Sequence, residues 1–392
     1  MKLFGYFAVA VVAVSCVKTM PPSPEEFELL DGPLAGLTYA EEIQFLRGDV
    51  AFGDIFTIDE GLGPVFVSNQ CASCHPGDGK GSEFVSFIRF GQVDSVNTFL
   101  DQGAPQLQHK AIPGYEQEQL PQGATFTELI APAVTGLGYL DAVSDAYLIS
   151  LSDPNDLDGD GISGVPHWNH IPDFVKLRPN SIMRNGKYIT RIGKKGAAYD
   201  LLHQTVAAYN QDMGITSIHN PIDVYSGQEI EPEVDLNTLN DVEFYLKTLK
   251  APIQRDTDSP NVIAGGDIFN AISCSSCHTP VMQTSESSIA ALNFVEFYPY
   301  TDLLLHDMGA DLDDGYTEGF AATYEWRTPP LWGLGLSKDS QGGEYLLLHD
   351  GRARTIEEAI MFHKGEANNS RLDYIELSDG YKSLLIEFLE SL

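Results

Sequence analysis

The sequence predicts a mainly α-helical protein of two related domains, with a long insertion in the first domain. Two short motifs, CASCH (Cys71–His75) and CSSCH (Cys274–His278), lie about two hundred residues apart. Similar residues surround each motif, and a polar segment with a proline, Ile253–Asn261, separates the two halves. A chain of 392 residues is long enough to bury a core in each of two domains.

The repeat has three features that occur in the same order in each half. A GDIF tetrapeptide precedes each cysteine pair, a proline- and glycine-containing segment follows it, and a probable amphipathic helix closes each half. This order predicts one domain over residues 41–252, which holds the insertion, and another over residues 261–392. The repeated segments are Gly53–Phe56 and Gly266–Phe269, Ala131–Gly138 and Thr328–Gly335, and Asp241–Pro252 and Asp379–Leu392.

The N-terminus, MKLFGYFAVAVVAVSC, has the pattern of an export signal over residues 1–16. Lys2 precedes an apolar run that is too short to span a bilayer. Cys16 follows small residues that resemble a lipoprotein processing box, so we expect a lipid anchor there, with simple signal removal as the alternative. Residues 17–40 are expected to be a flexible tether, and the protein to reside in the periplasm or cell envelope.

The four remaining cysteines all belong to the two CxxCH motifs. A zinc site built from two such pairs usually has them close together in sequence, and a thioredoxin-type motif needs a βαβ context that these flanks lack. In c-type haem attachment, the two thiols reach the two vinyl groups and the following histidine binds the iron. We therefore expect two covalent haems in cytochrome c-like domains. The attachment residues would be Cys71, Cys74, Cys274 and Cys277, and the proximal ligands His75 and His278.

The formal net charge of −33 excludes nucleic acid as a probable partner, because phosphates would repel the chain. An anionic membrane surface would repel it too, so membrane contact is expected through the lipid anchor only. A basic electron-transfer protein, such as a small cytochrome or a cupredoxin, is compatible with this charge. The alternative interpretation is that the acidity only keeps the protein soluble.

A helix is expected near the C-terminus, in HDGRARTIEEAIMFH (His349–His363). Thr355 and Glu358 have the spacing of a capping box, and Gly365 is a plausible stop. On such a helix Met361 points away from the face formed by four other residues. Helix geometry leaves open whether the histidine of this face binds iron or only ends the helix. The face consists of Ile356, Ala359, Ile360 and His363.

An acidic loop, DPNDLDGDGISG (Asp153–Gly164), spaces three aspartates at alternate positions before a glycine. Asp156, Asp158 and Asp160 are arranged as in loops that bind calcium through carboxylate oxygens. His167 stands where an EF-hand would have its glutamate, so the loop is not a complete EF-hand. The alternative is an ordinary surface loop of Asx turns.

Four longer stretches resemble the di-haem oxidoreductase (peroxidase) family, some members of which are described as thiol oxidoreductases. The stretches are FYPYTDLLLHDMG, EWRTPPLWGLGL, LHDGRARTIEEAI and DGDGISG, and the resemblance extends from about Phe45 to Leu392. The family is similar to bacterial di-haem cytochrome c peroxidases and to the di-haem enzyme that matures methylamine dehydrogenase. The resemblance implies peroxide chemistry at the N-terminal haem and electron relay through the C-terminal haem.

The resemblance also implies a sixth ligand for the C-terminal haem. In the relatives it follows the histidine of HDG by fourteen residues, which is His363 in this chain. The peroxidases commonly have methionine there, so this haem would have two histidine ligands and a lower potential. His349, in the HDG turn itself, is expected to form a hydrogen bond or a domain contact.

The groups around the N-terminal haem are less well defined by the sequence. Glu128 and Asp141 flank APAVTGLG and are candidates for acid–base chemistry on peroxide. Arg327 and Arg352 are candidates for binding haem propionates through their planar guanidinium groups. The basic segment RIGKKGAA (Arg191–Ala198) would bind a propionate or an acidic patch, or be a solvated turn. Possible sixth ligands of the N-terminal iron are His109, His167, His170, His203 and Met213.

The sequence thus predicts an exported di-haem c-type oxidoreductase of peroxidase type. A non-catalytic di-haem electron carrier is the first alternative. A thiol oxidoreductase that uses bare CxxC pairs is the second.

Overall fold

The computed structural model describes residues 25–91 and 99–392, in which helices predominate and account for 34% of the chain. This confirms the expected mainly helical character. The division into two cytochrome c-like domains remains a prediction. The α-helices are α2 (Tyr39–Gly53), α3 (Cys71–Cys74), α4 (Leu137–Asp141), α5 (Asp145–Leu151), α6 (Leu201–Met213), α7 (Leu236–Thr248), α8 (Pro260–Ala271), α9 (Ser337–Ser340), α10 (Ile356–Met361), α11 (Asn368–Glu376) and α12 (Asp379–Ser391).

The strands are short and pair only locally, in four two-stranded ribbons and one three-stranded sheet among the described residues. The ribbons pair β1 with β3, β2 with β4, β8 with β9 and β10 with β11, and the three-stranded sheet has the order β5-β7-β6. The strands are β1 (Val65–Phe66), β2 (Phe87–Gly91), β3 (Lys110–Ala111), β4 (Thr125–Leu129), β5 (His167–Asn169), β6 (Met183–Arg184), β7 (Lys187–Thr190), β8 (Met282–Gln283), β9 (Glu296–Phe297), β10 (Leu305–Asp307) and β11 (Glu325–Arg327).

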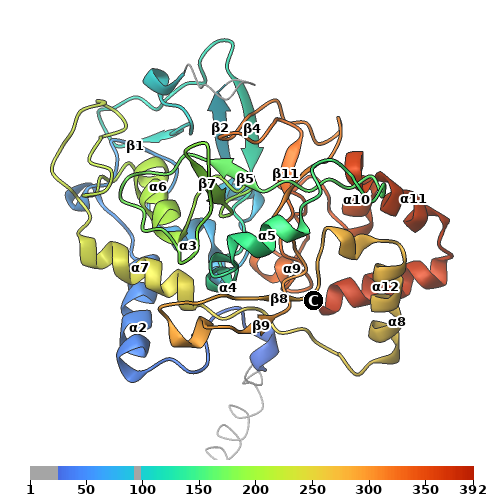
Figure 1. Ribbon diagram of the computed structural model, residues 1–392. Helices are drawn as coiled ribbons and strands as arrows, with labels where there is room; N and C mark the ends of the chain where they lie inside the picture. Colours follow the sequence, from blue (N-terminus) through green and yellow to red (C-terminus); the bar gives the residue numbers. More distant parts are fainter. Residues whose placement is uncertain (1–24, 92–98) are drawn as a thin grey trace, which may run out of the picture.

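The first half is organised by the crossing of α2 and α7 (Figure 1). Gly48 lies at the crossing, where a Cβ atom would collide with the carbonyl oxygen of Asp241 and lie 2.6 Å from the Cβ of Tyr245. One turn after Gly48, the ring of Phe52 contacts those of Tyr245 and His75, with centroids 5.4 and 6.0 Å apart. The absence of a side chain at Gly48 therefore lets the helices approach closely beside the first CxxCH motif.

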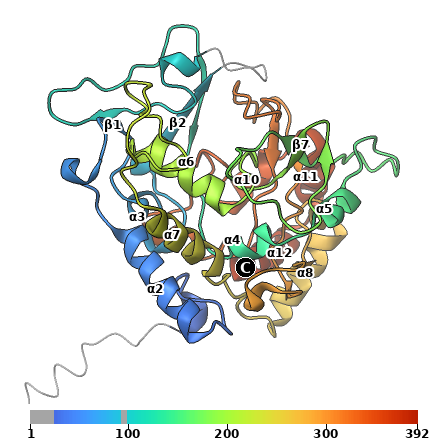
Figure 2. The same ribbon diagram turned by 60° about the vertical axis from the view of Figure 1, so that its left-hand side comes forward.

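The second half repeats this arrangement with α8 and α12. Gly265 lies at the crossing, where a Cβ atom would collide with the carbonyl oxygen of Leu384 and lie 2.6 Å from the Cβ of Phe388. Phe269, one turn later, packs on Phe388 with ring centroids 5.3 Å apart. The two helix pairs lie on opposite sides of the molecule (Figures 1 and 2).

In each of the repeated GLG segments, one glycine lies against the C-terminal end of the closing helix of its half. A Cβ atom at Gly138 would collide with the carbonyl oxygen of Lys247 near the end of α7. One at Gly335 would collide with that of Glu390 near the end of α12. This part of the expected repeat is confirmed, as are the two closing helices.

The expected equivalence of the two GDIF segments is wrong. Gly53 ends α2 with open space around it, and Phe56 lies in the following loop, whereas Gly266 and Phe269 are inside α8. The structural counterparts of Gly265 and Phe269 are Gly48 and Phe52. A tetrapeptide match can arise by chance, whereas a helix crossing requires its small residue at one place.

The expected signal peptide and Cys16 lie outside the described residues, as does the beginning of the expected tether. The tether prediction is wrong for Leu34, which is 5% exposed and donates its N–H to the carbonyl oxygen of Thr248 over 2.8 Å. No helix in the described part of the chain is sufficiently long and apolar to cross a membrane.

The two halves are joined by more than the segment that precedes α8. Ile130 donates its N–H to the carbonyl oxygen of His349 over 3.0 Å. The side-chain amide of Gln341 donates to the carbonyl oxygen of Gly81 over 3.2 Å. In the insertion, Val165 exchanges two backbone hydrogen bonds of 2.8 Å with Leu305 of β10. The halves therefore share a common interior.

The helix crossing predicts a difference between two glycines of α2. We expect Gly48→Ala to lower the free energy of unfolding by about 1–3 kcal/mol, because the added methyl group overpacks the crossing. The matched control Gly53→Ala, which meets no atom within 4 Å, should change it by less than about 1 kcal/mol. Chemical denaturation followed by circular dichroism measures both. Equal effects of the two substitutions would contradict the proposed crossing.

Candidate haem sites

One cavity of ≈ 490 Å³ runs between the two halves and is lined by both CxxCH motifs. Cys71, Cys74 and His75 lie along its N-terminal part, and Cys274, Cys277 and His278 along its C-terminal part. The rest of the lining is mostly apolar, as expected of a site for a large planar cofactor. All four thiols are free of disulfide bonds.

Three histidines that line the cavity share one hydrogen-bonding pattern. The Nδ1 atoms of His75, His278 and His363 lie 2.7, 3.0 and 2.7 Å from the carbonyl oxygens of Pro132, Tyr300 and Ala359. Since a carbonyl oxygen only accepts, each Nδ1 carries the proton and each Nε2 retains its lone pair. This is the tautomer that binds a metal through Nε2.

Burial also keeps these three imidazoles neutral. It lowers the pKa of His75 and of His278 to about 4, and it lowers that of His363 as well. A metal ligand must be unprotonated, so no proton has to be displaced at neutral pH. The residues present therefore fit haem iron at both motifs.

His278 and His363 face each other across the C-terminal part of the cavity. Their ring centroids are 6.4 Å apart. Two imidazoles that bind one metal through bonds of roughly 2 Å each have centroids about 6 Å apart. Met361 is 39% exposed and turned away, as helix geometry predicts. The separation supports His363, rather than Met361, as the partner of His278.

The helix that carries His363 differs in detail from the expectation. The hydroxyl of Thr355 accepts the N–H of Glu358 over 3.0 Å, but the Glu358 carboxylate accepts the N–H of Arg354 over 2.7 Å. Only half of the expected capping box therefore forms. Helix α10 ends at Met361, so Gly365 is not its stop. His349 is buried and stacks on Trp326 with centroids 3.9 Å apart, in agreement with a contact role.

The thiols are unsuited to redox chemistry of their own. Burial raises the pKa of Cys71 and of Cys274 to about 12, so both remain protonated at neutral pH. A reactive cysteine has a lowered pKa and a positively charged neighbour. For Cys71 and Cys274 this environment argues against the thiol oxidoreductase alternative, whereas the sulfur of Cys277 lies 3.7 Å from the His306 ring.

The histidines expected as sixth ligands near the first motif are committed elsewhere or lie away from the cavity. His109 and His170 do not line it. His167 bonds to Lys195 through Nδ1 and accepts the Phe320 N–H through Nε2. His203 lines the cavity, but its Nδ1 accepts the Tyr199 N–H over 3.2 Å. In the neutral ring the proton is therefore on Nε2, which cannot then bind a metal. Met213, the remaining candidate, is buried at the end of α6 and does line the cavity.

Helix α6 instead presents a row of polar residues that no sequence motif marks. Thr205, Tyr209 and Asp212, spaced four and three residues apart, lie on one helix face and line the cavity. The hydroxyls of Thr205 and Tyr209 are buried without a hydrogen-bond partner. Burial raises the pKa of Asp212 to about 6. Buried polar groups normally have partners, so this face fits a polar ligand in the cavity.

A network of charged and amide side chains holds the Asp212 carboxylate in place. The side-chain amide of Gln106 donates to the Asp212 carboxylate. Arg89 donates to Gln106 and to Gln211 over 3.3 and 2.7 Å, and forms an ion pair of 2.9 Å with Glu318. Arg89, Gln106, Gln211 and Glu318 all line the cavity.

Both carboxylates expected to act on peroxide are misplaced for that role. Glu128 is exposed on β4, where it accepts a hydrogen bond from Ser86, and does not line the cavity. Asp141 is buried outside the cavity in an ion pair of 3.0 Å with Arg178. Strand alternation points Glu128 outward, which proximity in sequence to APAVTGLG did not reveal.

The two arginines expected at the propionates behave differently. Arg327 lines the cavity and is buried, with Nε donating to the carbonyl oxygen of Gly193 over 2.9 Å. Arg352 is exposed, bonds to Asp350 over 2.5 Å and lies outside the cavity, so the prediction for Arg352 is wrong. The segment Arg191–Ala198 is no solvated turn, because Arg191 and Lys195 are 1% and 2% exposed.

A buried triad lies beside the second motif. His306 pairs with Asp302 through Nε2 over 2.8 Å and with Glu366 through Nδ1 over 2.6 Å. Its Nδ1 also lies 3.7 Å from the sulfur of Cys277. The hydrogen bonds to His306 and Ser163 outweigh burial and hold the pKa of Glu366 at about 2. Since Glu366 also accepts the N–H of Ser163 over 3.1 Å, the triad ties the acidic loop to the C-terminal site.

In the acidic loop, Asp156, Asp158 and Asp160 are exposed and have carboxylate oxygens within 4.8 Å of one another. Each also accepts a backbone N–H of the loop, as in Asx turns. His167, which occupies the twelfth position of the loop pattern, is buried elsewhere. Calcium binding remains a prediction.

A family model described as "Di-haem oxidoreductase, putative peroxidase" matches residues 122–392. No curated protein matches the chain. Solved structures resemble it weakly at 14% identity, and TM-scores below 0.5 establish neither fold nor function. The hydrazine synthase of Kuenenia stuttgartiensis has a TM-score of 0.37, with 95% of this chain and 96% of that chain covered. A MauG-like protein associated with microbial copper homeostasis has 0.41, with 95% of each covered. The diheme peroxidase BthA from Burkholderia thailandensis has 0.41, with 89% and 86% covered.

The buried triad predicts a pH-dependent stability. A lowered carboxyl pKa contributes stability above the unfolded pKa, near 4.5, and this contribution is lost as pH falls toward 2. We expect Glu366→Gln to cost about 3 kcal/mol at pH 7, because it leaves His306 incompletely paired. The difference from the unsubstituted protein should shrink below pH 4.5. The exposed Glu376→Gln is the control, and urea denaturation at pH 7, 4.5 and 3 measures the effect. A cost that does not change with pH would contradict the assignment.

Proposed function

The chain belongs to the di-haem oxidoreductase family, and from this we propose that it is an exported c-type peroxidase with two unlike haem sites. Cys71 and Cys74 would bind the N-terminal haem, with His75 on its iron. Cys274 and Cys277 would bind the C-terminal haem. Its iron would be held between His278 and His363, so that this site relays electrons while peroxide reacts at the other.

The observation that carries the proposal is the difference between the two parts of the cavity. The C-terminal part has two imidazoles with free Nε2 atoms at the separation that one iron requires. Among the described residues, no histidine ring pairs with His75 as His363 does with His278. His203 has the opposite tautomer, and His349 lines the cavity with a buried Nε2 atom that has no partner. That part instead has unpaired hydroxyls and a carboxyl of raised pKa. A closed iron suits electron transfer, and an open one suits a small oxidant.

The residues on α6 would handle the protons. Reduction of peroxide to water takes two electrons and two protons, and a haem with an open position supplies the redox chemistry when bound. With a pKa of about 6, Asp212 can take a proton from bound peroxide and return it at neutral pH. The hydroxyls of Thr205 and Tyr209 are available to orient the oxidant. Gln106 holds the Asp212 carboxylate in place.

The electron donor in this proposal is a basic carrier protein, such as a cytochrome or a cupredoxin. The net charge of −33 favours such a partner through long-range attraction. The proposed export and lipid anchor at Cys16 rest on the sequence of residues 1–16. A non-catalytic di-haem carrier is the alternative, and it requires two low-spin haems and no turnover of peroxide.

Substitution of His363 tests the closed C-terminal site. We expect His363→Ala to convert one of two haems from low spin to high spin, because the iron loses its second imidazole. The exposed His170→Ala should leave both haems unchanged. Electron paramagnetic resonance and absorption spectra of the oxidised protein report the spin states. If the low-spin signal survived in His363→Ala, another residue would have to be the ligand.

Substitution of Asp212 tests the reactive site. We expect Asp212→Asn to lower peroxide turnover by about a hundredfold, because the amide still bonds Gln106 but moves no proton. Activity of the unsubstituted protein should fall below pH 6, where Asp212 is protonated, and this acid limb should vanish in the variant. Glu128→Gln, outside the cavity, is the matched control. Undiminished turnover in Asp212→Asn, with both haems present, would rule out this role.

A further inference from the structure

Most buried cations of the described chain have a carboxylate partner, but three cations in the cavity do not. Arg89 pairs with Glu318, and Arg178 with Asp141. Lys195 pairs with Asp314 over 3.1 Å and also donates to the carbonyl oxygens of Ala322 and Thr323. Lys80, Lys194 and Arg327 line the cavity and form no ion pair within the described residues.

The contrast between the adjacent lysines of RIGKKG is informative. Lys195 donates to a carboxylate and two carbonyl oxygens, whereas Lys194 lines the cavity and forms no hydrogen bond or ion pair with the described residues. Asp350 is the acidic group that favours charged Lys194, but its carboxylate already binds Arg352 over 2.5 Å. Burial and the nearby charges of Lys80 and Arg327 lower the pKa of Lys194 to about 7. Lys194 therefore lacks an anion.

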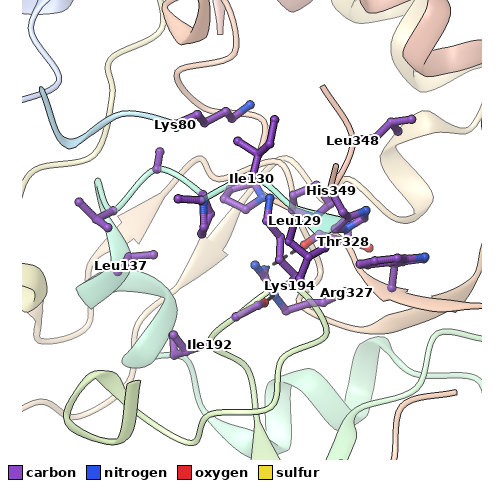
Figure 3. A pocket seen from close by; sticks show the side chains of 18 of the residues that line it. Lys80, Leu129, Ile130, Leu137, Ile192, Lys194, Arg327, Thr328, Leu348 and His349 are labelled. Carbon is purple, nitrogen blue, oxygen red and sulfur yellow. Dashed lines mark hydrogen bonds between the residues drawn. The ribbon is translucent and has the colours of Figure 1, made fainter. Parts of the chain in front are cut away.

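The three cations converge from three distant segments. Figure 3 shows Lys194, Arg327 and His349 close together and Lys80 beyond Ile130 in the same pocket; Lys80 and Arg327 both act electrostatically on Lys194. Arg327 packs directly on the RIGKKG loop through its bond to the carbonyl oxygen of Gly193. Nη1 of Arg327 donates to the carbonyl oxygen of Thr328 over 3.1 Å, so Nη2 is left to bind an anion. In a chain of net charge −33, such a gathering of positive charge implies a bound anion.

We propose that Lys80, Lys194 and Arg327 form a carboxylate-binding cluster that takes the propionate groups of both haems. This inference rests on the proposed function, because it requires haem at both motifs. Lys80 follows His75 by five residues, and Lys194 acts electrostatically on His75, so both belong to the N-terminal haem. Arg327 precedes Thr328, whose carbonyl oxygen binds the hydroxyl of Thr301 beside Tyr300, the partner of His278. Asp302 acts electrostatically on both Arg327 and His278, so we assign Arg327 to the C-terminal haem.

The cluster would influence the electrostatic potential at both haem sites. The propionate edges of both haems would meet the same loop, Arg191–Gly196. Each cation stabilises the reduced, less positive state of the haem that it serves, and the low polarity of the cavity strengthens this effect. The midpoint potentials of the two haems should therefore depend on these three residues. The identity of the iron ligands should not change when these residues are substituted.

The test measures haem potentials and propionate vibrations in the full haem-loaded protein. We expect Lys194→Met and Lys80→Met to shift the midpoint potential of the N-terminal haem to more negative values. Arg327→Met should do the same to the C-terminal haem. Each should also shift the propionate bending bands in the resonance Raman spectrum, which a purely structural role would not do. Lys194→Arg should restore both readouts, and the exposed Lys176→Met should leave both unchanged.

The outcomes separate this inference from the proposed function. If the unsubstituted protein carries two haems that survive denaturing electrophoresis, but potentials and propionate bands are unchanged in Lys80→Met and in Lys194→Met, the cluster is wrong and the function stands. If one lysine variant does not fold, the other decides. If the unsubstituted protein carries no covalent haem, both proposals are overturned. If the three cation variants shift the potentials and propionate bands as expected, but the unsubstituted haem-loaded protein does not turn over peroxide, the proposed function is overturned and the cluster stands.

Discussion

The site depends on the hydrogen bond between a histidine Nδ1 and a backbone carbonyl oxygen. It occurs at His75, His278 and His363, and in each case it fixes the tautomer and leaves Nε2 free. A carbonyl oxygen can only accept, so the choice of tautomer follows from the fold and not from pH. His203, which lines the same cavity, has its Nδ1 on a backbone N–H and therefore the opposite tautomer. This contact distinguishes the three proposed ligands from His203, and both nitrogens of His306 are paired with carboxylates, whereas His349 also leaves a buried Nε2 atom without a partner.

A helix crossing lies beside each CxxCH motif. Gly48 and Gly265 let α2 meet α7 and α8 meet α12 at a distance that a side chain would prevent. The aromatic residue one turn later, Phe52 or Phe269, then packs at the crossing beside the CxxCH segment. The same design appears twice, yet the two halves carry different polar groups into the cavity. In the proposed function, the repeated frame would provide two haem sites, and the unrepeated residues would make them unlike.

The polar groups divide into two kinds by their partners. Lys195 and His306 are buried and paired with carboxylates, and Lys195 also donates to two carbonyl oxygens, so both contribute to holding the fold. The hydroxyl of Tyr209 is buried without a partner, and Lys194 forms no ion pair among the described residues; both line the cavity. Because burying a polar group without a partner is costly, unsatisfied groups gathered in one cavity indicate its ligand. The hydroxyls suit a small oxidant, and the cations suit carboxylates.

The sequence by itself determined the chemistry that depends on spacing. The CxxCH motifs, the closing helices, the helix before His363 and the outward direction of Met361 follow from covalent and helical geometry within a few residues. The family register then pointed to His363, and its separation from His278 supports this. The sequence misjudged Glu128, Asp141, Arg352 and the GDIF repeat, since each of these depends on which way a side chain faces in the folded chain.

Only the tertiary structure decided what gathers around the cavity. Asp212, Lys80, Lys194 and Arg327 come from segments far apart in the chain. Local patterns marked Arg327 and the basic segment that holds Lys194, but not Asp212 or Lys80. Lys194 and Lys195 are adjacent and chemically identical, yet one is paired and the other faces the cavity. That difference arises because consecutive residues of a loop point in different directions, and only the packing of the loop against Arg327 and Trp326 fixes which is which.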